Sequence, residues 1–400
     1  MGVLNNIRIH IKKVLGGWIM VLFFCATPVQ IYRAVNLKEQ FYNDKKCKMY
    51  IFDYFNGAAD YVEKCKAKGI FEDVVFVEFY KISQRTNALK YKKSKLFGEI
   101  QNLFFKFLHS NNQLRNLYAR IWAVYYYVLK NDVLKLTGIK KDEQIEEILF
   151  SYFDPIMQML YLKLDNKNIE YNRYEDGTGT YFNGAVFPER RFDKWLKIGE
   201  NIFIPKKVFV RIPEALKDYE EVKKTGAKIY KTDFSENKKS KEVLYDIFDI
   251  KNIPEIKEKI IFFDTLIENQ DIDAMINPLS RFTKQELVYK KHPRRKDTYY
   301  EKKDVNVYSG ASLPFEMYCE YFDVSDKILI SHCSTACIAP ALYFNQSPVS
   351  IICYDFATTK KDDSYNYFDD FLNVLLDGDT PLKLHKPRTR KDYENLISTF

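Results

Sequence analysis

Two neighbouring carboxylates precede a glycine in the stretch NRYEDGTGTYFNG, residues 172–184. Glu175 and Asp176 are close enough for each carboxylate to raise the pKa of the other, and Gly177 allows the backbone to approach a ligand. One of the two carboxylates would then serve as a general base. A surface turn is the competing interpretation, because Glu-Asp-Gly is also a common turn sequence.

His292 has surroundings that suit an anionic ligand. It ends a predicted strand, precedes Pro293, and lies within the basic segment KKHPRRK at residues 290–296. Neighbouring cations lower the pKa of an imidazole, whereas a bound phosphate would keep it protonated until a leaving group needs the proton. A general acid behaves in this way. A surface histidine in a basic loop would explain the same residues without a ligand.

A third candidate is the segment KILISHCSTACIAPALYF at residues 327–344. It predicts a strand, a short polar turn and the start of a helix. Ser334 and Thr335 would present hydroxyls and backbone N–H groups at that helix N-terminus, which suits a phosphate. An ordinary N-cap explains the same pair without a ligand.

Two acidic triplets, DID at residues 271–273 and DGD at residues 377–379, resemble those of metal-dependent nucleotide-sugar enzymes. Carboxylates two residues apart are frequent by chance. The first triplet predicts a helix start and the second a loop, and no His/Cys cluster has the spacing of a zinc site. We therefore predict neither a metal nor another cofactor.

The elements that must position these residues alternate between strands and helices. Such alternation predicts parallel sheets covered by helices. In the first half, strands are predicted at 49–55, 73–80, 148–154, 168–174, 207–212 and 227–233, with helices near 58–68, at two places within 95–131 and from Pro155. The carboxylates follow the strand 168–174, and ligands of open α/β sheets bind at such strand ends.

A second series of strands follows the segment 248–259, which we interpret as an interdomain linker. These strands are predicted at 259–265, 286–293, 305–310, 327–331 and 349–356.

The apolar segment 14–29 favours a buried first strand with a turn and helix over a targeting sequence, because it is short for a membrane span and continues into a helical pattern. The basic residues before it leave contact with a membrane surface open.

Composition limits the possible classes of function. A chain of 400 residues predicts two domains, and its net charge of +8 suits nucleic acid, an anionic membrane or an anionic substrate equally well. The sequence has no nucleic-acid-binding signature, so we predict no nucleic-acid partner. Its 7 cysteines form no C-x-x-C pair, which is typical of a reducing compartment.

The order of the three candidate motifs resembles that of the bacterial sialyltransferases. The closest likeness is to glycosyltransferase family 52, the lipooligosaccharide and capsule type. It rests on YEDGTGTY, KKHPRR, LPFE at 313–316, the Ser-Thr segment and the opening FFCATPVQIYRAV, which together span residues 22 to about 345. Residues 82–147 and 183–258 carry no matching landmark.

This resemblance implies a GT-B fold, in which two Rossmann-like domains with parallel sheets face each other across a cleft. The acceptor domain would comprise residues 1–247 and the CMP-donor domain residues 248–400. It also implies metal-independent, inverting transfer of sialic acid from CMP-sialic acid to a terminal galactose of a surface glycan, with α-2,3 linkage favoured.

The roles of individual residues also follow from the resemblance. Asp176 would be the base, His292 would assist departure of the phosphate, and Asp264 is the alternative base. The substrate-binding residues would be Thr27, Glu175, Gly177, Pro293, Arg294, Glu316, Ser334 and Thr335. Glu316 would hold the nucleoside and the Ser-Thr pair the phosphate, with His332 and Cys333 beside that pair.

Two other functions compete with this one. A GT-B enzyme could use another nucleotide-activated sugar, and a basic protein could bind a membrane surface or a polyanion without catalysis. Because nucleotide sugars are made inside the cell, we expect a cytoplasmic protein, with the inner membrane face as its place of contact with a lipid-linked glycan. A homodimer is compatible with the resemblance.

Overall fold

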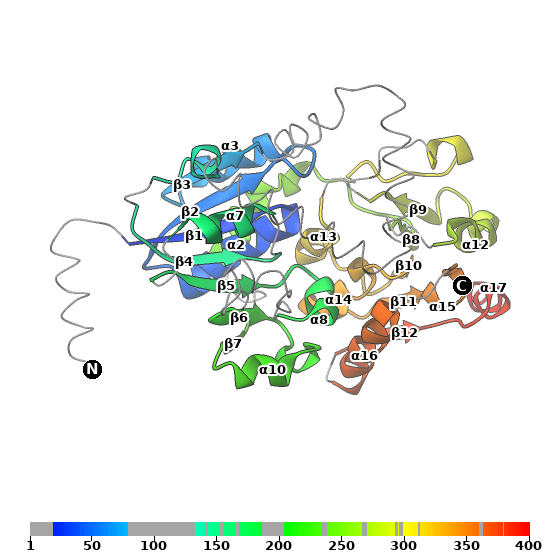
Figure 1. Cartoon of the computed structure of the whole chain (residues 1–400). Coiled ribbons are helices and arrows are strands. Elements are labelled where there is room, and N and C mark those ends of the chain that lie inside the picture. Colours follow the sequence, from blue (N-terminus) through cyan, green and yellow to red (C-terminus); the bar gives the residue numbers. More distant parts are fainter. Residues whose placement is uncertain are drawn as a thin grey trace, which may run out of the picture.

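The computed structural model shows two α/β domains, each built on a parallel sheet (Figure 1). It describes residues 19–78, 133–140, 143–152, 155–164, 168–185, 204–233, 238–265, 270–292, 295, 299–310, 313–359, 363–378 and 380–400. The two helices predicted within 95–131 therefore lie outside the described residues, as do Pro293 and Arg294.

The first sheet has seven strands in the order β3-β2-β1-β4-β5-β6-β7, and every described pairing in it is parallel. Its central strands are buried along nearly their whole length, which suits a sheet covered on both faces. The strands are β1 Met20–Cys25, β2 Lys46–Phe52, β3 Asp73–Val77, β4 Ile145–Phe150, β5 Glu170–Tyr174, β6 Lys207–Val210 and β7 Lys228–Lys231.

The second sheet has five parallel strands in the order β12-β11-β10-β8-β9. Its strands are β8 Ile260–Phe263, β9 Leu287–Lys290, β10 Ile328–Ser331, β11 Val349–Ile352 and β12 Lys383–His385. The predicted boundary at residue 248 falls in the connection between the two sheets, between α11 and β8, and its placement stays a prediction.

Helices cover the faces of both sheets (Figure 1). The first of them, α2, begins after Thr27, whose hydroxyl accepts a hydrogen bond from the Gln30 N–H at 3.2 Å. The α-helices are α2 Pro28–Phe41, α3 Ala58–Lys68, α7 Pro155–Lys163, α8 Gly179–Asn183, α10 Tyr219–Lys224, α11 Lys238–Ile247, α12 Ile272–Ile276, α13 Phe315–Tyr321, α14 Ala339–Phe344, α15 Tyr354–Ala357, α16 Asp363–Asp377 and α17 Arg390–Ile397. Short 3-10 helices are η1 Pro213–Ala215, η2 Ile250–Asn252, η3 Asn277–Arg281, η4 Glu301–Lys303 and η5 Thr335–Cys337.

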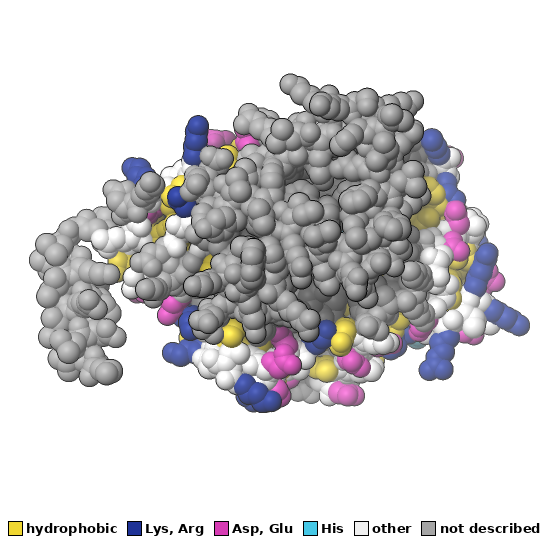
Figure 2. Space-filling view, viewed as in Figure 1, with side chains coloured by type: hydrophobic (Ala, Val, Ile, Leu, Met, Phe, Trp, Pro, Cys, Tyr) yellow, Lys and Arg dark blue, Asp and Glu magenta, His cyan; other side chains and the backbone are white. Residues whose placement is uncertain are grey.

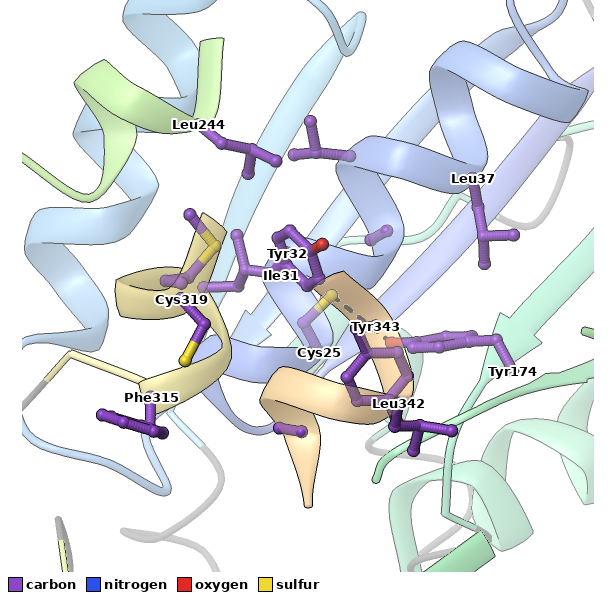
Figure 3. Close-up of a cluster of buried hydrophobic side chains, with 14 of the residues drawn as sticks. Cys25, Ile31, Tyr32, Leu37, Tyr174, Leu244, Phe315, Cys319, Leu342 and Tyr343 are labelled. Atoms are coloured by element: carbon purple, nitrogen blue, oxygen red, sulfur yellow. Dashed lines mark hydrogen bonds between the residues drawn. The ribbon is translucent and has the colours of Figure 1, made fainter. Parts of the chain in front are cut away.

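One apolar core runs through both domains. Figure 3 shows part of it, where Ile31 and Tyr32 of α2 lie near Leu244 of α11, Phe315 of α13 and Leu342 of α14. Two further clusters fill the outer faces of the sheets. The domains are thus joined through an interface packed like a core.

Helix α16 also joins the domains, because it follows the second sheet in sequence but packs against α8 and η1 of the first domain. The rings of Phe371 and Tyr181 are stacked with centroids 4.7 Å apart. The ammonium of Lys217 lies 3.5 Å from the centre of the Tyr367 ring. The C-terminal part of the chain therefore contributes to both domains.

Two predicted elements differ from the structure. The segment 305–310 was predicted as a strand but forms only a single bridge with β9, between Tyr289 and Val307. Two backbone hydrogen bonds, at 2.8 and 3.0 Å, join this segment to Tyr289, which is too few for a strand. The predicted strand 349–356 ends at Ile352, and its last residues begin α15. Strand β12 and the helices α8, α11, α13, α16 and α17 were not predicted.

The beginning of the described chain agrees with the prediction of a buried strand followed by a turn and helix, since β1 is buried throughout and α2 follows it. Among the described residues, no helix has both the length and the apolar character needed to cross a membrane. On the face shown in Figure 2, the visible Lys and Arg side chains are scattered among Asp and Glu.

Candidate active site

The order of strands determines where the two sheets can hold a ligand. In a doubly wound sheet, ligands bind at the carboxyl ends of the strands, where the strand order reverses direction. The reversal falls between β1 and β4 in the first sheet and between β8 and β10 in the second. The candidate residues follow strands at or beside these two points.

A cavity of about 720 Å³ lies between the domains at these strand ends. Eight of the predicted site residues line it. They are Thr27, Asp176 and Gly177 from the first domain, and Asp264, His292, Glu316, Ser334 and Thr335 from the second. The structure therefore brings together three motifs that are far apart in the sequence.

Asp176 lies in the loop after β5 and faces this cavity. Burial raises its pKa to about 6, although hydrogen bonds from Gln30 and Thr27 and the charge of Arg173 favour the ionised form. The acidic neighbour that raises the pKa further is Glu316. The Thr27 hydroxyl donates to Asp176 Oδ1 at 3.4 Å.

Glu175 has surroundings unlike those of Asp176. Among the residues that the structure describes, it is not part of the cavity wall, and its side chain is only 2% exposed. It forms an ion pair with Arg33, with Nη2 and Oε1 3.2 Å apart. This geometry therefore does not support substrate contact by Glu175. From the sequence we expected the two carboxylates to raise each other's pKa, but the main cause of the raised pKa of Asp176 is desolvation.

The loop after Asp176 contacts the second domain directly. Gly177 has a left-handed φ of +77°, and an added Cβ would lie 3.3 Å from Thr335 Oγ1. The Oγ1 atoms of Thr178 and Thr335 are 2.7 Å apart, and the Thr178 N–H donates to Thr335 Oγ1 at 3.3 Å. Glycine therefore allows both a positive φ and this close contact.

Asp264 follows β8 and is held in an ion pair. Its Oδ1 accepts a hydrogen bond from Arg295 Nη2 at 2.7 Å, and its Oδ2 accepts from Arg295 Nε. Oδ2 also accepts the backbone N–H of His292 at 3.2 Å, and the Arg295 N–H donates to the His292 carbonyl at 2.9 Å. Asp264 thus anchors the turn that carries His292.

Lys290 and Glu316 place buried charges of opposite sign at the cavity. Lys290 Nζ donates to the Leu313 carbonyl at 2.8 Å, and burial lowers its pKa to about 8 although Glu316 opposes the shift. Burial raises the pKa of Glu316, which lies in the first turn of α13. Lys291 adds a further basic side chain to the same wall.

The Ser-Thr segment combines the two interpretations offered for it. Ser334 is the N-cap of η5 and its hydroxyl accepts the Ala336 N–H at 3.2 Å, yet Ser334 and Thr335 also line the cavity. His332 Nε2 lies 2.9 Å from Thr358 Oγ1, and burial lowers the pKa of His332 to about 4. Neither His332 nor Cys333 belongs to the described cavity wall.

Arg173 is a cavity residue that we did not predict. Its side chain is buried in the wall, its Nε donates to the Ser151 carbonyl at 3.2 Å, and burial lowers its pKa to about 10. The sequence did contain a signal for Arg173, because a charged residue in an otherwise buried strand just before the Glu-Asp-Gly motif indicates a functional position. Lys290, the last residue of the buried strand β9, is a second charged residue of this kind.

The aromatic part of the wall was not predicted either. It includes Phe24 and Phe52, whose ring centroids are 5.9 Å apart, together with Tyr54, Phe55 and Phe150. These residues belong to strands or follow them, so their sequence pattern indicated only a buried core.

Within the described ranges, no group of three or more His, Cys, Asp or Glu side chains is placed to hold a metal ion. Metal independence stays a prediction.

Neither a protein-family model nor a curated protein sequence matches the chain. Among solved structures, it is similar to the glycotransferase of kitacinnamycin, with a TM-score of 0.50, 9% identity, and coverage of 96% of this chain and 91% of that one. TcCGT1 in complex with UDP has a TM-score of 0.48 and 9% identity over 95% and 90% of the chains. MurG of Acinetobacter baumannii has a TM-score of 0.40 and 10% identity over 95% and 90%.

The first of these likenesses confirms the fold expected from the sequence. The chain has a GT-B arrangement of two Rossmann-like domains with parallel sheets. Because the sequence identity is low, the likeness establishes the fold alone. The narrower resemblance to family 52 stays a prediction.

Proposed function

We propose that this chain is an inverting, metal-independent sialyltransferase that moves sialic acid from CMP-sialic acid to a terminal galactose of a bacterial surface glycan. The observation that supports this proposal is the cavity shared by the two domains, whose wall includes Asp176 from the first domain and His292, Glu316, Ser334 and Thr335 from the second. The order of these motifs supports CMP-sialic acid as the donor, and α-2,3 is the linkage that we propose from the resemblance to family 52.

Asp176 is the general base in this proposal. With a pKa of about 6, its carboxyl is about nine-tenths ionised at pH 7 and is more basic than an ordinary aspartate. It takes the proton of the acceptor hydroxyl as the acceptor oxygen bonds to the anomeric carbon of sialic acid. The bond from that carbon to the phosphate oxygen of CMP breaks on the opposite face, so the configuration is inverted.

The second domain stabilises the leaving group. His292 donates a proton or hydrogen bond to the departing phosphate, and Lys290 and Lys291 supply positive potential on the same wall. Asp264 holds the His292 turn in place through its backbone N–H. Ser334 and Thr335 bind the phosphate and Thr27 contacts substrate on the other side of the cavity.

Glu316 is the residue that we assign to the nucleoside. It lies at the cavity wall, and burial raises its pKa. A carboxyl in such a site offers either an acceptor or, when protonated, a donor to a ribose hydroxyl or a cytosine edge. Its charge is balanced by Arg33 and Lys290 rather than by solvent.

The choice between the two possible bases follows from their partners. Both oxygens of Asp264 accept hydrogen bonds from the charged guanidinium of Arg295, whereas the side-chain donors to Asp176 are the neutral groups of Gln30 and Thr27. A base must release its existing contacts in order to accept a proton, and the contact with Arg295 occupies both oxygens of Asp264. We therefore assign the base to Asp176 and a positioning role to Asp264.

The proposal is tested by a transfer assay. The purified chain is incubated with CMP-sialic acid and lactose, with and without EDTA, and the anomeric configuration of the product is read by NMR. We expect a sialylated lactose of inverted configuration whose formation is insensitive to EDTA. Transfer from a UDP-sugar and none from CMP-sialic acid would replace this proposal with the broader GT-B alternative.

The non-catalytic alternative makes a different prediction. A basic protein that binds membranes or polyanions would bind anionic vesicles with a steep dependence on salt and would transfer no sugar. In the sialyltransferase proposal the chain works in the cytoplasm, where nucleotide sugars are made. A lipid-linked acceptor would bring it to the inner membrane face, so vesicle binding together with transfer agrees with that proposal.

A further inference from the structure

Glu175 is a buried point at which several parts of the fold meet. Its Oε1 accepts hydrogen bonds from Arg33 Nη2 at 3.2 Å and from the Tyr343 hydroxyl. Its Oε2 accepts from the Tyr181 hydroxyl at 2.6 Å and from the Arg211 N–H at 2.8 Å. Two donors thus serve each carboxylate oxygen.

The donors come from both domains. Arg33 lies on α2, Tyr181 on α8 and Arg211 directly after β6, all in the first domain, whereas Tyr343 lies on α14 of the second. The Arg33 guanidinium also lies 4.2 Å from the centre of the Tyr343 ring. Figure 3 shows Tyr343 within the core that the two domains share.

The surroundings of Glu175 make these contacts costly to lose. A carboxylate that is removed from water must have its charge balanced and its oxygens hydrogen-bonded. Burial raises the pKa of Tyr343 far above its ordinary value, so the phenol keeps its proton and stays a donor at neutral pH. Loss of one donor leaves a buried oxygen with an incomplete set of partners.

The position of Glu175 in the chain connects this cluster to the cavity. Asp176 is the next residue, and two residues further on Thr178 bonds to Thr335 of the second domain with their Oγ1 atoms 2.7 Å apart. The short loop is therefore fixed to the second domain on both sides of Asp176. One attachment is Glu175 to Tyr343 and the other is Thr178 to Thr335.

We propose that Glu175 is a positioning residue whose contact with Tyr343 fixes the loop bearing Asp176 to the second domain, so that the base faces the donor site before substrate binds. This proposal rests on the function assigned to Asp176. The Glu-Asp pair then divides two tasks, with Glu175 placing the loop and Asp176 accepting the proton. A holding contact of this kind lowers the reorganisation that turnover requires.

The substitution Tyr343→Phe tests the proposal in the full chain. It removes one hydroxyl and retains the ring that packs on Arg33. We expect amide hydrogen exchange in residues 175–181 to accelerate by about tenfold, the scale of losing one buried hydrogen bond to a charged group. The matched control is Tyr308→Phe, whose hydroxyl donates to the Pro254 carbonyl at 2.7 Å within the second domain.

The result that would overturn the proposal is unchanged exchange in residues 175–181 of Tyr343→Phe, or the same change in Tyr308→Phe. Glu175→Gln should accelerate exchange further, because an amide offers only one acceptor oxygen to the four donors. Should Glu175→Gln not fold, Tyr181→Phe serves as the second variant, since it removes another donor to Glu175. Its hydroxyl also accepts the N–H groups of Arg211 and Ile212 at 3.2 Å, so this variant should accelerate exchange more than Tyr343→Phe does.

Kinetics distinguish positioning from a purely structural role. Tyr343→Phe should lower kcat by about tenfold while the Kd for CMP stays unchanged, because the donor wall is intact. Faster exchange with unchanged kcat would overturn the positioning role. Failure of the proposed function would appear instead as no turnover in the unmodified chain, and the exchange comparison would then decide on the interdomain contact alone.

Discussion

Asp176 and Asp264 occupy corresponding places in the two domains, yet their environments differ. Each aspartate follows a parallel strand and lines the same cavity. Asp176 receives a hydrogen bond of 3.4 Å from Thr27 and has its pKa raised to about 6. Asp264 is held by both nitrogens of an arginine fork and by a backbone N–H.

This difference shows that position in the fold alone does not identify a base. The ends of the strands bring both carboxylates to the cavity, but the partners of each decide what it can do. A desolvated carboxyl with neutral hydrogen-bond donors can exchange a proton near neutral pH, whereas a carboxylate held by a guanidinium serves to fix its neighbours. Substitution of Asp176 should therefore lower turnover, whereas substitution of Asp264 should lower stability.

The largest expected effect is on turnover in Asp176→Asn. We expect kcat to fall by about 10² to 10⁴ while the Kd for CMP changes little, because a general base contributes that much and does not contact the nucleotide. The measurement is transfer from CMP-sialic acid beside CMP binding by calorimetry. Near-normal turnover in the folded variant would move the base to Asp264.

Asp176→Asn should also leave the fold intact. A pKa raised above its ordinary value means that the folded chain disfavours the ionised carboxyl, so stability falls as the pH rises from about 4 to about 6 and the loss is complete at pH 7. Removing that charge should not lower the melting temperature at pH 7. A large decrease would show that the carboxylate has a structural role.

The next largest effect is on stability in Asp264→Asn. The Asp264 side chain is 1% exposed and that of Arg295 12%, so the substitution leaves a largely buried guanidinium with a weaker partner. We expect the free energy of unfolding to fall by about 3 kcal/mol, measured by urea denaturation. A stability equal to that of Asp176→Asn would remove the distinction between the two sites.

The pH dependence of the unmodified chain should show a smaller effect. Since the base must be ionised, kcat/KM should fall below pH 6 and be about tenfold lower at pH 5 than on its plateau. The measurement is an initial-rate profile from pH 5 to about 8, with stability monitored at each pH. A rate that stays level down to about pH 5 would exclude a base with this pKa.

The smallest expected effect concerns Lys290, whose lowered pKa of about 8 means that it loses its charge as the pH rises through that value. The affinity for CMP should therefore decrease about fivefold between pH 7 and 9 in the unmodified chain, the size of one partly screened charge interaction. Lys290→Met should bind CMP more weakly at pH 7 and lose this dependence. The same pH dependence in both proteins would exclude Lys290 as a source of the potential.

Much of the fold was predictable because parallel strands give a strong signal. The central strands of both sheets, such as β1 and β10, are short apolar runs, and the predicted helix near 58–68 agrees with α3 Ala58–Lys68. Motifs at strand ends could be placed beside one another because such ends share one edge of a sheet. The exception at 305–310 arose because a short alternating pattern does not reveal whether a neighbouring strand is available over its whole length.

The individual roles within the site were less accessible from the sequence. Glu175 and Asp176 are neighbours of similar chemistry, and only the packing of α2, α8 and α14 shows that one carboxylate is enclosed and the other faces the cavity. The partner of Asp264 could not be inferred either, since several basic residues follow His292. Contacts between residues distant in sequence decide these roles.

Thermal unfolding with CMP, CDP, UMP or UDP tests whether the cavity between the domains binds a cytidine nucleotide, on which the proposed donor depends. CMP and CDP at about 100 times Kd should each stabilise the chain by about 2.7 kcal/mol, and Glu316→Gln should reduce that stabilisation. Uridine nucleotides should have little effect. No stabilisation by any of the four, or preferential stabilisation by UMP and UDP, would contradict the claim.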